Sequence, residues 1–272
     1  MHEVVLHIAH GGPALARLAA HAGVLDAGEE ASAARFRFAA DRELYQAAHV
    51  LLRRALSAQV PVDLAQWRFI RGAHGRPEID PIACPEARGL RFNLSHTRGL
   101  VCCALTRGLP VGVDAECPRP MQDARAITER FFAAEEAAAV AAAGAPGSAA
   151  EATTFRNLWT LKEAYVKALG LGLSMGLADF AFRLTGSAPA AIALHGPAGA
   201  DHPAAHWRCL LLHLEPGGWT LAAAVPAATG ARFQALLHTP DGADATGAAL
   251  AGCTAATELA WVRAVPMAAA HR

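Results

Sequence analysis

The chain has 272 residues, of which 53% are hydrophobic and 18% charged, so it can fill a sizeable core and is not a disordered chain. Its 24 basic and 24 acidic residues cancel, which argues against a protein that holds nucleic acid by bulk electrostatics. No apolar run approaches the roughly 20 residues of a membrane helix, and the first residues show no signal-peptide pattern. We therefore expect a cytoplasmic protein without a nucleic-acid or membrane partner.

The six cysteines agree with that compartment. None belongs to a C-x-x-C pair, and the adjacent Cys102 and Cys103 would point to opposite faces of a strand. We predict reduced, mostly buried thiols.

The first part of the chain predicts an α+β unit. Apolar periodicity indicates a strand at 4–8, helices at 12–21 and from about residue 31, a helix within 41–60 that Asp41 caps, and a strand near 67–71. The Gly/Pro loop "GAHGRPEI" follows at 72–79. Residues 90–116 then predict a strand, a polar loop, a strand, a turn at 107–110 and a last strand.

The second part of the chain has a similar plan. Residues 121–143 are predicted to be helical, "GAPGS" at 144–148 interrupts them, and 151–169 form a helix that Gly170 closes. Further strands are predicted at 180–184, 190–194, 207–215 and 219–225. We therefore predict an α+β fold with halves at 1–109 and 110–226, followed by a variable Ala/Gly-rich extension over 227–272.

The stretch "VGVDAE" at 111–116 combines a buried strand with negative charge. Asp114 and Glu116 are two residues apart, so on an extended chain they face the same side. Either the strand reaches water there, or a positive group lies against that face. Paired carboxylates suit a hard cation such as Mg²⁺, which usually also binds substrate phosphates.

The helix predicted at 151–169 carries a second pattern. Trp159, Glu163 and Lys167 are spaced by four and share one stripe, separate from the apolar stripe that includes Leu158 and Leu161. A surface ion pair between Glu163 and Lys167, with a contribution of about 0.3–0.5 kcal/mol, is the plain alternative to a functional role.

Two loops offer further polar residues. "FNLSHT" at 92–97 places Ser95 and His96 in a predicted loop, and "HGRP" at 74–77 places Arg76 in a rigid one. A Ser–His hydrolase is disfavoured, because adjacent residues rarely aim at one another and no G-x-S-x-G elbow surrounds them. For Arg76 a plain turn is the simpler interpretation.

The order of these motifs is more specific than any one of them. "HGRP", "FNLSHT", "VGVDAE", "RFFAAEE" and "WTLKEAYVKALGLGL" resemble the 4'-phosphopantetheinyl transferases of the larger, single-chain, surfactin-synthetase-activating type, over about Phe36 to Val225. The resemblance implies a holo-acyl-carrier-protein synthase that moves phosphopantetheine from coenzyme A to a carrier-protein serine and releases adenosine 3',5'-bisphosphate. It also implies a monomer of two pseudo-symmetric halves, with coenzyme A in the cleft between them.

The resemblance further implies roles for individual residues. Asp114, Glu116 and Glu163 would hold Mg²⁺, Glu163 or a metal-bound water would take the serine proton, and Lys167 would contact the pyrophosphate. Asp114, Glu163 and Lys167 form the predicted catalytic set. The predicted coenzyme A contacts are Arg76, Asn93, Ser95, His96, Lys162, Lys167 and Arg42.

The sequence leaves two features open. The basic residues that relatives place before the first long helix are here Glu29, Glu30 and Ser32, so the missing charge would come from Arg35, Arg37, Arg42 or Arg53. The carrier protein, of fatty-acid, polyketide or non-ribosomal-peptide type, would dock near Arg119, Met121, Arg125 and Phe132, unless Phe131 and Phe132 are core residues. The alternative functions are a coenzyme A or nucleotide binding module without turnover, and the Ser95/His96 hydrolase.

Overall fold

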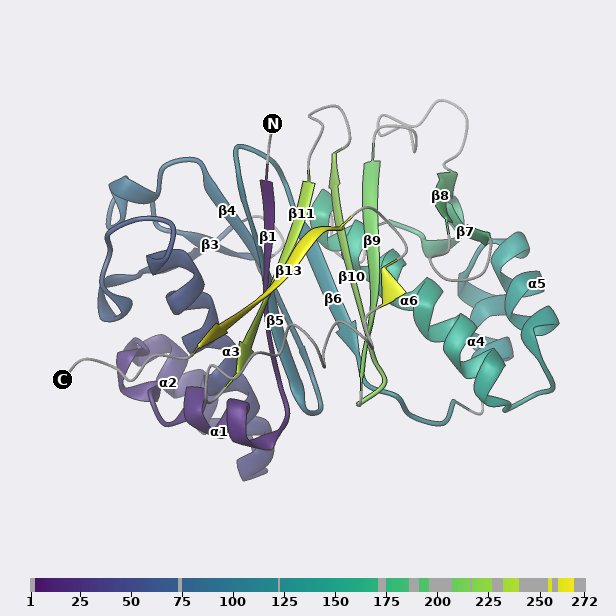
Figure 1. Ribbon diagram of the computed structural model, residues 1–272, viewed down its shortest axis with the longest axis horizontal. Helices are drawn as coiled ribbons and strands as arrows, with labels where there is room; N and C mark the ends of the chain where they lie inside the picture. Colours follow the sequence, from purple (N-terminus) through teal and green to yellow (C-terminus); the bar gives the residue numbers. More distant parts are fainter. Residues whose placement is uncertain are drawn as a thin grey trace.

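A computed structural model describes residues 3–72, 75–121, 123–170, 175–185, 191–195, 207–215, 217–226, 232–239, 254–255 and 259–266. In this part of the chain, a five-stranded and a four-stranded sheet lie face to face between two layers of helices (Figure 1). The predicted α+β class is therefore confirmed.

The first sheet combines strands from both ends of the chain. Its order is β13 (Leu259–Pro266), β11 (Arg232–Thr239), β1 (Glu3–His10), β5 (Leu100–Arg107) and β4 (Leu90–Thr97). β1 pairs in parallel with β11 and antiparallel with β5, and β5 pairs antiparallel with β4. The strand β4 is therefore one edge of this sheet.

The second sheet is antiparallel. Its order is β12 (Thr254–Ala255), β9 (Trp207–Leu214), β10 (Trp219–Pro226) and β6 (Gly112–Glu116). Short hairpins join β2 (Phe69–Arg71) to β3 (Pro77–Ile79) and β7 (Ala181–Thr185) to β8 (Ala191–His195). β6 is the edge of the second sheet.

Helices cover the outer face of each sheet. The first half contributes α1 (Gly12–Ala19), α2 (Ala27–Ala34) and α3 (Ala39–Ser57), and the second contributes α4 (Ala124–Phe131), α5 (Ala134–Ala143) and α6 (Ala149–Leu169). Figure 1 shows the first set on the left and the second on the right, with the sheets between them. α6 begins at the Ser148 cap and ends at Gly170, whose φ of 70° is left-handed, as predicted.

The apolar core fills the three spaces between these four layers. Side chains such as Leu51, Trp67 and Leu105 pack between α3 and the first sheet. The space between the sheets holds residues of β1, β5, β6, β9, β10 and β11. Phe155 and Leu161 of α6 pack on the outer face of the second sheet.

Several local expectations are corrected. α3 begins at Ala39 with Phe38 in the cap position, so Asp41 lies inside the first turn, where its charge favours the positive helix end. α2 begins at Ala27, because Asp26 and Glu29 form a reciprocal capping box. Ser95 and His96 lie in strand β4 instead of a loop.

The C-terminal segment also differs from its expected place outside both halves. β11 pairs along β1, and its Phe233, Ala235 and Leu237 are buried between the sheets. Part of 227–272 is therefore a component of the core, although the predicted borders at 109 and 226 stay predictions. Sequence reasoning missed this because strand pairing over such a separation leaves no local signal.

Two smaller observations complete the fold. Cys84, Cys102, Cys103, Cys117 and Cys209 are free and buried, as expected, and Cys253 lies outside the described residues. No helix in the described ranges combines the length and apolar character that crossing a membrane requires.

Candidate active site

The edge strands β4 and β6 face one another and are joined by side chains. Alternate positions of β4 supply these bonds: Asn93 Oδ1 accepts from the Val113 amide at 2.8 Å, Ser95 Oγ donates to Asp114 Oδ1 at 3.0 Å, and Thr97 Oγ1 accepts from the Cys117 amide at 3.2 Å. This period of two is that of one face of a strand. We call these three contacts the seam; they hold the two sheets together where no backbone ladder does so.

Helix α6 lies against the outer face of β6 because that strand has a glycine at the contact. A Cβ on Gly112 would lie 1.9 Å from the carbonyl oxygen of Ala164, far closer than a Cβ approaches a non-bonded atom. Val113 and Ala115 point into the core between the sheets, so Gly112, Asp114 and Glu116 face the helix. The absent side chain lets α6 bring Glu163 and Lys167 over this strand.

Asp114 is the centre of the polar cluster that results. Lys167 Nζ donates to Asp114 Oδ1 at 2.6 Å, to Ser95 Oγ at 3.3 Å and to the Val113 carbonyl at 3.4 Å. The other carboxylate oxygen, Oδ2, is buried and has no hydrogen-bond partner among the described residues. An unpartnered buried carboxylate oxygen is costly, so its position indicates a cationic or donor ligand.

The two glutamates are close enough to Asp114 to repel it. Burial, followed by the charge of Asp114, raises the pKa of both Glu116 and Glu163. Arg119 lies 3.9 Å from Glu116, and the charge of Lys167 partly offsets the effect on Glu163. Asp114 of β6 therefore lies within electrostatic reach of both Glu116 and Glu163.

The side chains are not arranged as finished metal ligands. Among the described residues, no three His, Cys, Asp or Glu side chains form a group that could hold an ion as they stand. The cation that faces Asp114 is the ammonium group of Lys167. The charge of Asp114 acts on both glutamates, and the use of the three carboxylates as ligands of one ion stays a prediction.

His96 lies on the other face of β4 from Ser95 and near α3. Its side chain is exposed, but partial desolvation, followed by the charges of His49 and Lys167, lowers the pKa of His96. Because successive residues of a strand point to opposite faces, Ser95 and His96 do not form a nucleophile–base pair. Arg42 is exposed on the first turns of α3, and its role at coenzyme A stays a prediction.

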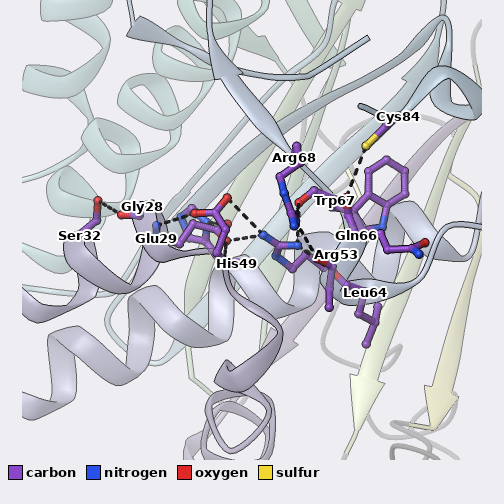
Figure 2. A network of polar contacts seen from close by, with 12 residues as sticks. Gly28, Glu29, Ser32, His49, Arg53, Leu64, Gln66, Trp67, Arg68 and Cys84 are labelled. Atoms are coloured by element: carbon purple, nitrogen blue, oxygen red, sulfur yellow. Dashed lines mark hydrogen bonds and ion pairs between the residues drawn. The ribbon is translucent and has the colours of Figure 1, made fainter. Parts of the chain in front are cut away.

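A buried network in the first half excludes Arg53 as the missing ligand for a phosphate (Figure 2). The Arg53 side chain is fully buried, and its Nη1 donates to the Leu64 carbonyl at 2.7 Å and to the Trp67 carbonyl at 3.1 Å. Its Nη2 donates to Glu29, whose other oxygen is 2.7 Å from His49 Nδ1. Glu29 thus compensates a buried arginine instead of facing a ligand.

The expectation that Lys162 contacts phosphate is wrong. Lys162 is fully buried, with its Nζ 2.7 Å from Glu136 Oε2. It also donates to the carbonyl oxygens of Leu177 at 2.7 Å and Phe180 at 2.6 Å. Successive helix residues are about 100° apart, so Lys162 faces α5 and the β7 region while Glu163 faces β6.

Arg76 also has contacts that the sequence did not indicate. Its guanidinium donates to the carbonyl oxygens of Lys167 at 2.9 Å, Phe92 at 2.8 Å and Val111 at 2.9 Å. These groups belong to both halves, so Arg76 closes one end of the seam.

A largely apolar cavity of about 390 Å³ opens beside Glu116. Met121, Phe131 and Trp159 are among its lining residues, together with Arg119 and Arg156. The sequence expectation named Phe132, but Phe132 is buried in the core and Phe131 is 47% exposed.

Arg125, one of the basic residues expected at the docking surface, is used in contacts within the protein. It bonds to Glu151 and to the Gly144 carbonyl, which ties α4 to α6. The sequence alone does not show which of the adjacent Phe131 and Phe132 is exposed, because that depends on how the end of α4 packs.

Two family models match the chain in succession. One, described as the N-terminal part of 4'-phosphopantetheinyl transferase, matches residues 12–107. The other, described as the 4'-phosphopantetheinyl transferase superfamily, matches residues 110–224 and includes Asp114, Glu116, Glu163 and Lys167.

Curated relatives show the same similarity. The 4'-phosphopantetheinyl transferase HetI of Nostoc sp. is 34% identical over 170 residues, which are 62% of this chain and 69% of that relative. Psf-1 of Bacillus pumilus is 34% identical over 61% of this chain and 66% of its own length. Sfp of Bacillus subtilis is 33% identical over 50% of this chain and 55% of its own length.

Proposed function

Because the chain belongs to the 4'-phosphopantetheinyl transferase superfamily, we propose that it transfers the 4'-phosphopantetheine group of coenzyme A to a serine of an acyl or peptidyl carrier protein. Adenosine 3',5'-bisphosphate is the second product. The observation that supports this most directly is the buried, unpartnered Oδ2 of Asp114 beside two carboxyl groups of raised pKa.

The chemical type of these donors suits a magnesium ion, although the side chains would have to move to bind it together. Asp114, Glu116 and Glu163 would supply carboxylate oxygens, the ligand type that Mg²⁺ prefers. The buried Oδ2 of Asp114 has no hydrogen-bond partner among the described residues and would gain one in the ion. Crowded negative charge of this kind is relieved by a divalent cation. When bound, Mg²⁺ would neutralise charge on the pyrophosphate of coenzyme A.

Glu163 is the proposed general base. Its raised pKa makes it a better proton acceptor than an ordinary carboxylate, and it lies on the side of α6 that faces β6. It would take the proton of the carrier serine hydroxyl as the serine oxygen bonds to the pantetheine-bearing phosphorus. The bond from that phosphorus to the bridging oxygen breaks, and adenosine 3',5'-bisphosphate leaves with its electron pair.

Lys167 is the proposed stabiliser of the leaving group. Asp114 and Ser95 hold its ammonium at 2.6 and 3.3 Å, so its position is fixed before substrate arrives. A preorganised cation beside the departing phosphate lowers the barrier without reorganisation during the reaction. His96 would bind the nucleotide phosphates from the opposite face of β4.

The seam defines the proposed course of coenzyme A. The molecule would lie in a cleft between two pseudo-symmetric halves, along β4 and β6. The carrier protein would dock over the cavity beside Glu116, where Phe131 and Met121 offer apolar contact and Arg119 offers positive charge to an acidic partner. The chain would act as a monomer, because the acidic and basic residues of the site come from one copy.

The test is labelling of apo carrier proteins, measured by intact mass. Wild-type protein with coenzyme A and Mg²⁺ is expected to add one phosphopantetheine to at least one carrier of a panel. Glu163→Gln and Lys167→Ala are expected to lower the rate by at least about 100-fold, in line with the loss of a base or a preorganised cation. Glu30→Gln, at an exposed position of α2, is the matched control.

Two results would count against the proposal. Coenzyme A binding without mass gain on any carrier would indicate a binding module, and labelling that survives EDTA would exclude the magnesium site.

A further inference from the structure

One guanidinium group binds carbonyl oxygens on three separate elements. Arg76 immediately precedes β3. It reaches Phe92 in β4, Val111 before β6, and Lys167 in the last turn of α6. The last four carbonyl groups of a helix have no intrahelical donor, and α6 ends at Leu169, so Lys167 needs an outside partner. Arg76 supplies it.

Both strands in this contact are sheet edges. β4 ends the first sheet and β6 ends the second, so their outward carbonyl groups have no neighbouring strand in the described sheets. Arg76 Nη2 lies 2.8 Å from the Phe92 oxygen and 2.9 Å from the Val111 oxygen and thus bridges the two edges. It extends the seam of Asn93, Ser95 and Thr97 by one more contact.

Arg76, which connects the two sheet edges, also holds the part of α6 that carries Lys167. Arg76 Nη1 holds the backbone of Lys167 at 2.9 Å, and the side chain of Lys167 reaches Asp114 at 2.6 Å. A shift of α6 along β6 would separate Lys167 from Asp114. We infer that Arg76 is a positioning residue, which sets the place of α6 against β4 and β6 and so where Lys167 and Asp114 meet.

This role, which rests on the proposed function, needs arginine. The planar fork offers several donors in fixed directions, and here two nitrogens serve three acceptors. A lysine ammonium is a single point and cannot replace both nitrogens. A residue that only supplies charge to a phosphate would retain much of that contact as lysine, which binds phosphate as a point charge.

The experiment compares Arg76→Lys and Arg76→Ala with the wild-type chain. The rate of carrier labelling gives kcat, and calorimetric titration of coenzyme A without carrier gives Kd, both well below the melting temperature of each variant. Arg91→Ala is the control. Arg91 is exposed on β4, and it is close enough to Arg76 for its charge to lower the pKa of Arg76. For both Arg76 variants we expect kcat to fall at least about tenfold, with Kd within about threefold of wild type.

Other outcomes overturn the inference. A weaker Kd in Arg76→Ala that Arg76→Lys restores would make Arg76 a phosphate contact. Unchanged kcat in both variants, with only a lower melting temperature, would make it purely structural. Failure of the wild-type chain to label any carrier is a separate result: it would remove the proposed function and, with it, this role.

Discussion

A buried charged side chain needs polar partners inside the protein, and Arg53 shows how many it can require. Its guanidinium is fully buried and bonded to Glu29 and two carbonyl oxygens. The Glu29 carboxylate in turn accepts from the backbone amide of the cap residue Asp26 and contacts His49, so one carboxylate joins α2 to α3. A buried charge is tolerated only while its partner stays in place.

Glu29→Ala tests this dependence. The substitution removes the nearer of the two carboxylates beside buried Arg53 and leaves Asp26 Oδ2, 3.7 Å from its Nη2. Removal of one partner of a buried pair costs about 3–5 kcal/mol. We therefore expect the free energy of unfolding to fall by about that amount, measured by urea denaturation at pH 7. Glu30→Ala, its exposed neighbour on α2, should change it by less than about 0.5 kcal/mol. Equal effects of the two variants would contradict the assignment.

At the scale of elements, the active site depends on how closely α6 approaches β6. Gly112 is the position that permits it, since a Cβ there would lie 1.9 Å from the Ala164 carbonyl oxygen and 2.5 Å from the Ala168 amide nitrogen. Both atoms are helix backbone and cannot rotate away. A side chain at 112 must therefore displace the helix that carries Glu163 and Lys167.

Gly112→Ala is accordingly expected to impair catalysis more than stability. Overpacking costs about 1–3 kcal/mol, whereas displacement of catalytic groups by about 1 Å can lower the rate about 100-fold. The measurements are the carrier-labelling rate and the urea midpoint. Gly12→Ala, where an added Cβ meets nothing within 4 Å, is the control. Near-normal labelling by Gly112→Ala would show that the close packing of α6 on β6 does not determine the positions of Glu163 and Lys167.

These elements also explain what the sequence could predict. The pairs Asp114/Glu116 and Glu163/Lys167 follow the periods of a strand and a helix, so the shared face of each pair could be foreseen. The role of Lys162 could not be predicted, because its charge is paired with Glu136, which belongs to another helix. Arg76 has the same difficulty, since its acceptors are backbone groups 16, 35 and 91 residues away. Side-chain type alone does not distinguish a ligand from a bridge.

At the scale of the whole molecule, the first sheet joins both ends of the chain through β1 and β11. His7 of β1 and His238 of β11 stack with ring centroids 5.1 Å apart, and His7 Nδ1 lies 2.9 Å from His238 Nε2. Burial, followed by the charge of His238, lowers the pKa of His7 to about 3. Burial, followed by Arg54, lowers the pKa of His238 to about 4.

Both imidazoles are therefore neutral in the folded protein, while the unfolded chain binds protons below its ordinary histidine pKa of about 6.5. The stability that this provides is present above about pH 6.5 and is lost as the pH falls toward 4, by at most about 1.4 kcal/mol per pH unit for each group. Urea denaturation at pH 7.5, 6.0 and 5.0 should show this loss, and His238→Gln should reduce its slope. His195→Gln, at an exposed position of β8, should leave the slope unchanged. An equal slope in wild type and His238→Gln would mean that the joined ends of the chain do not sense pH through this pair.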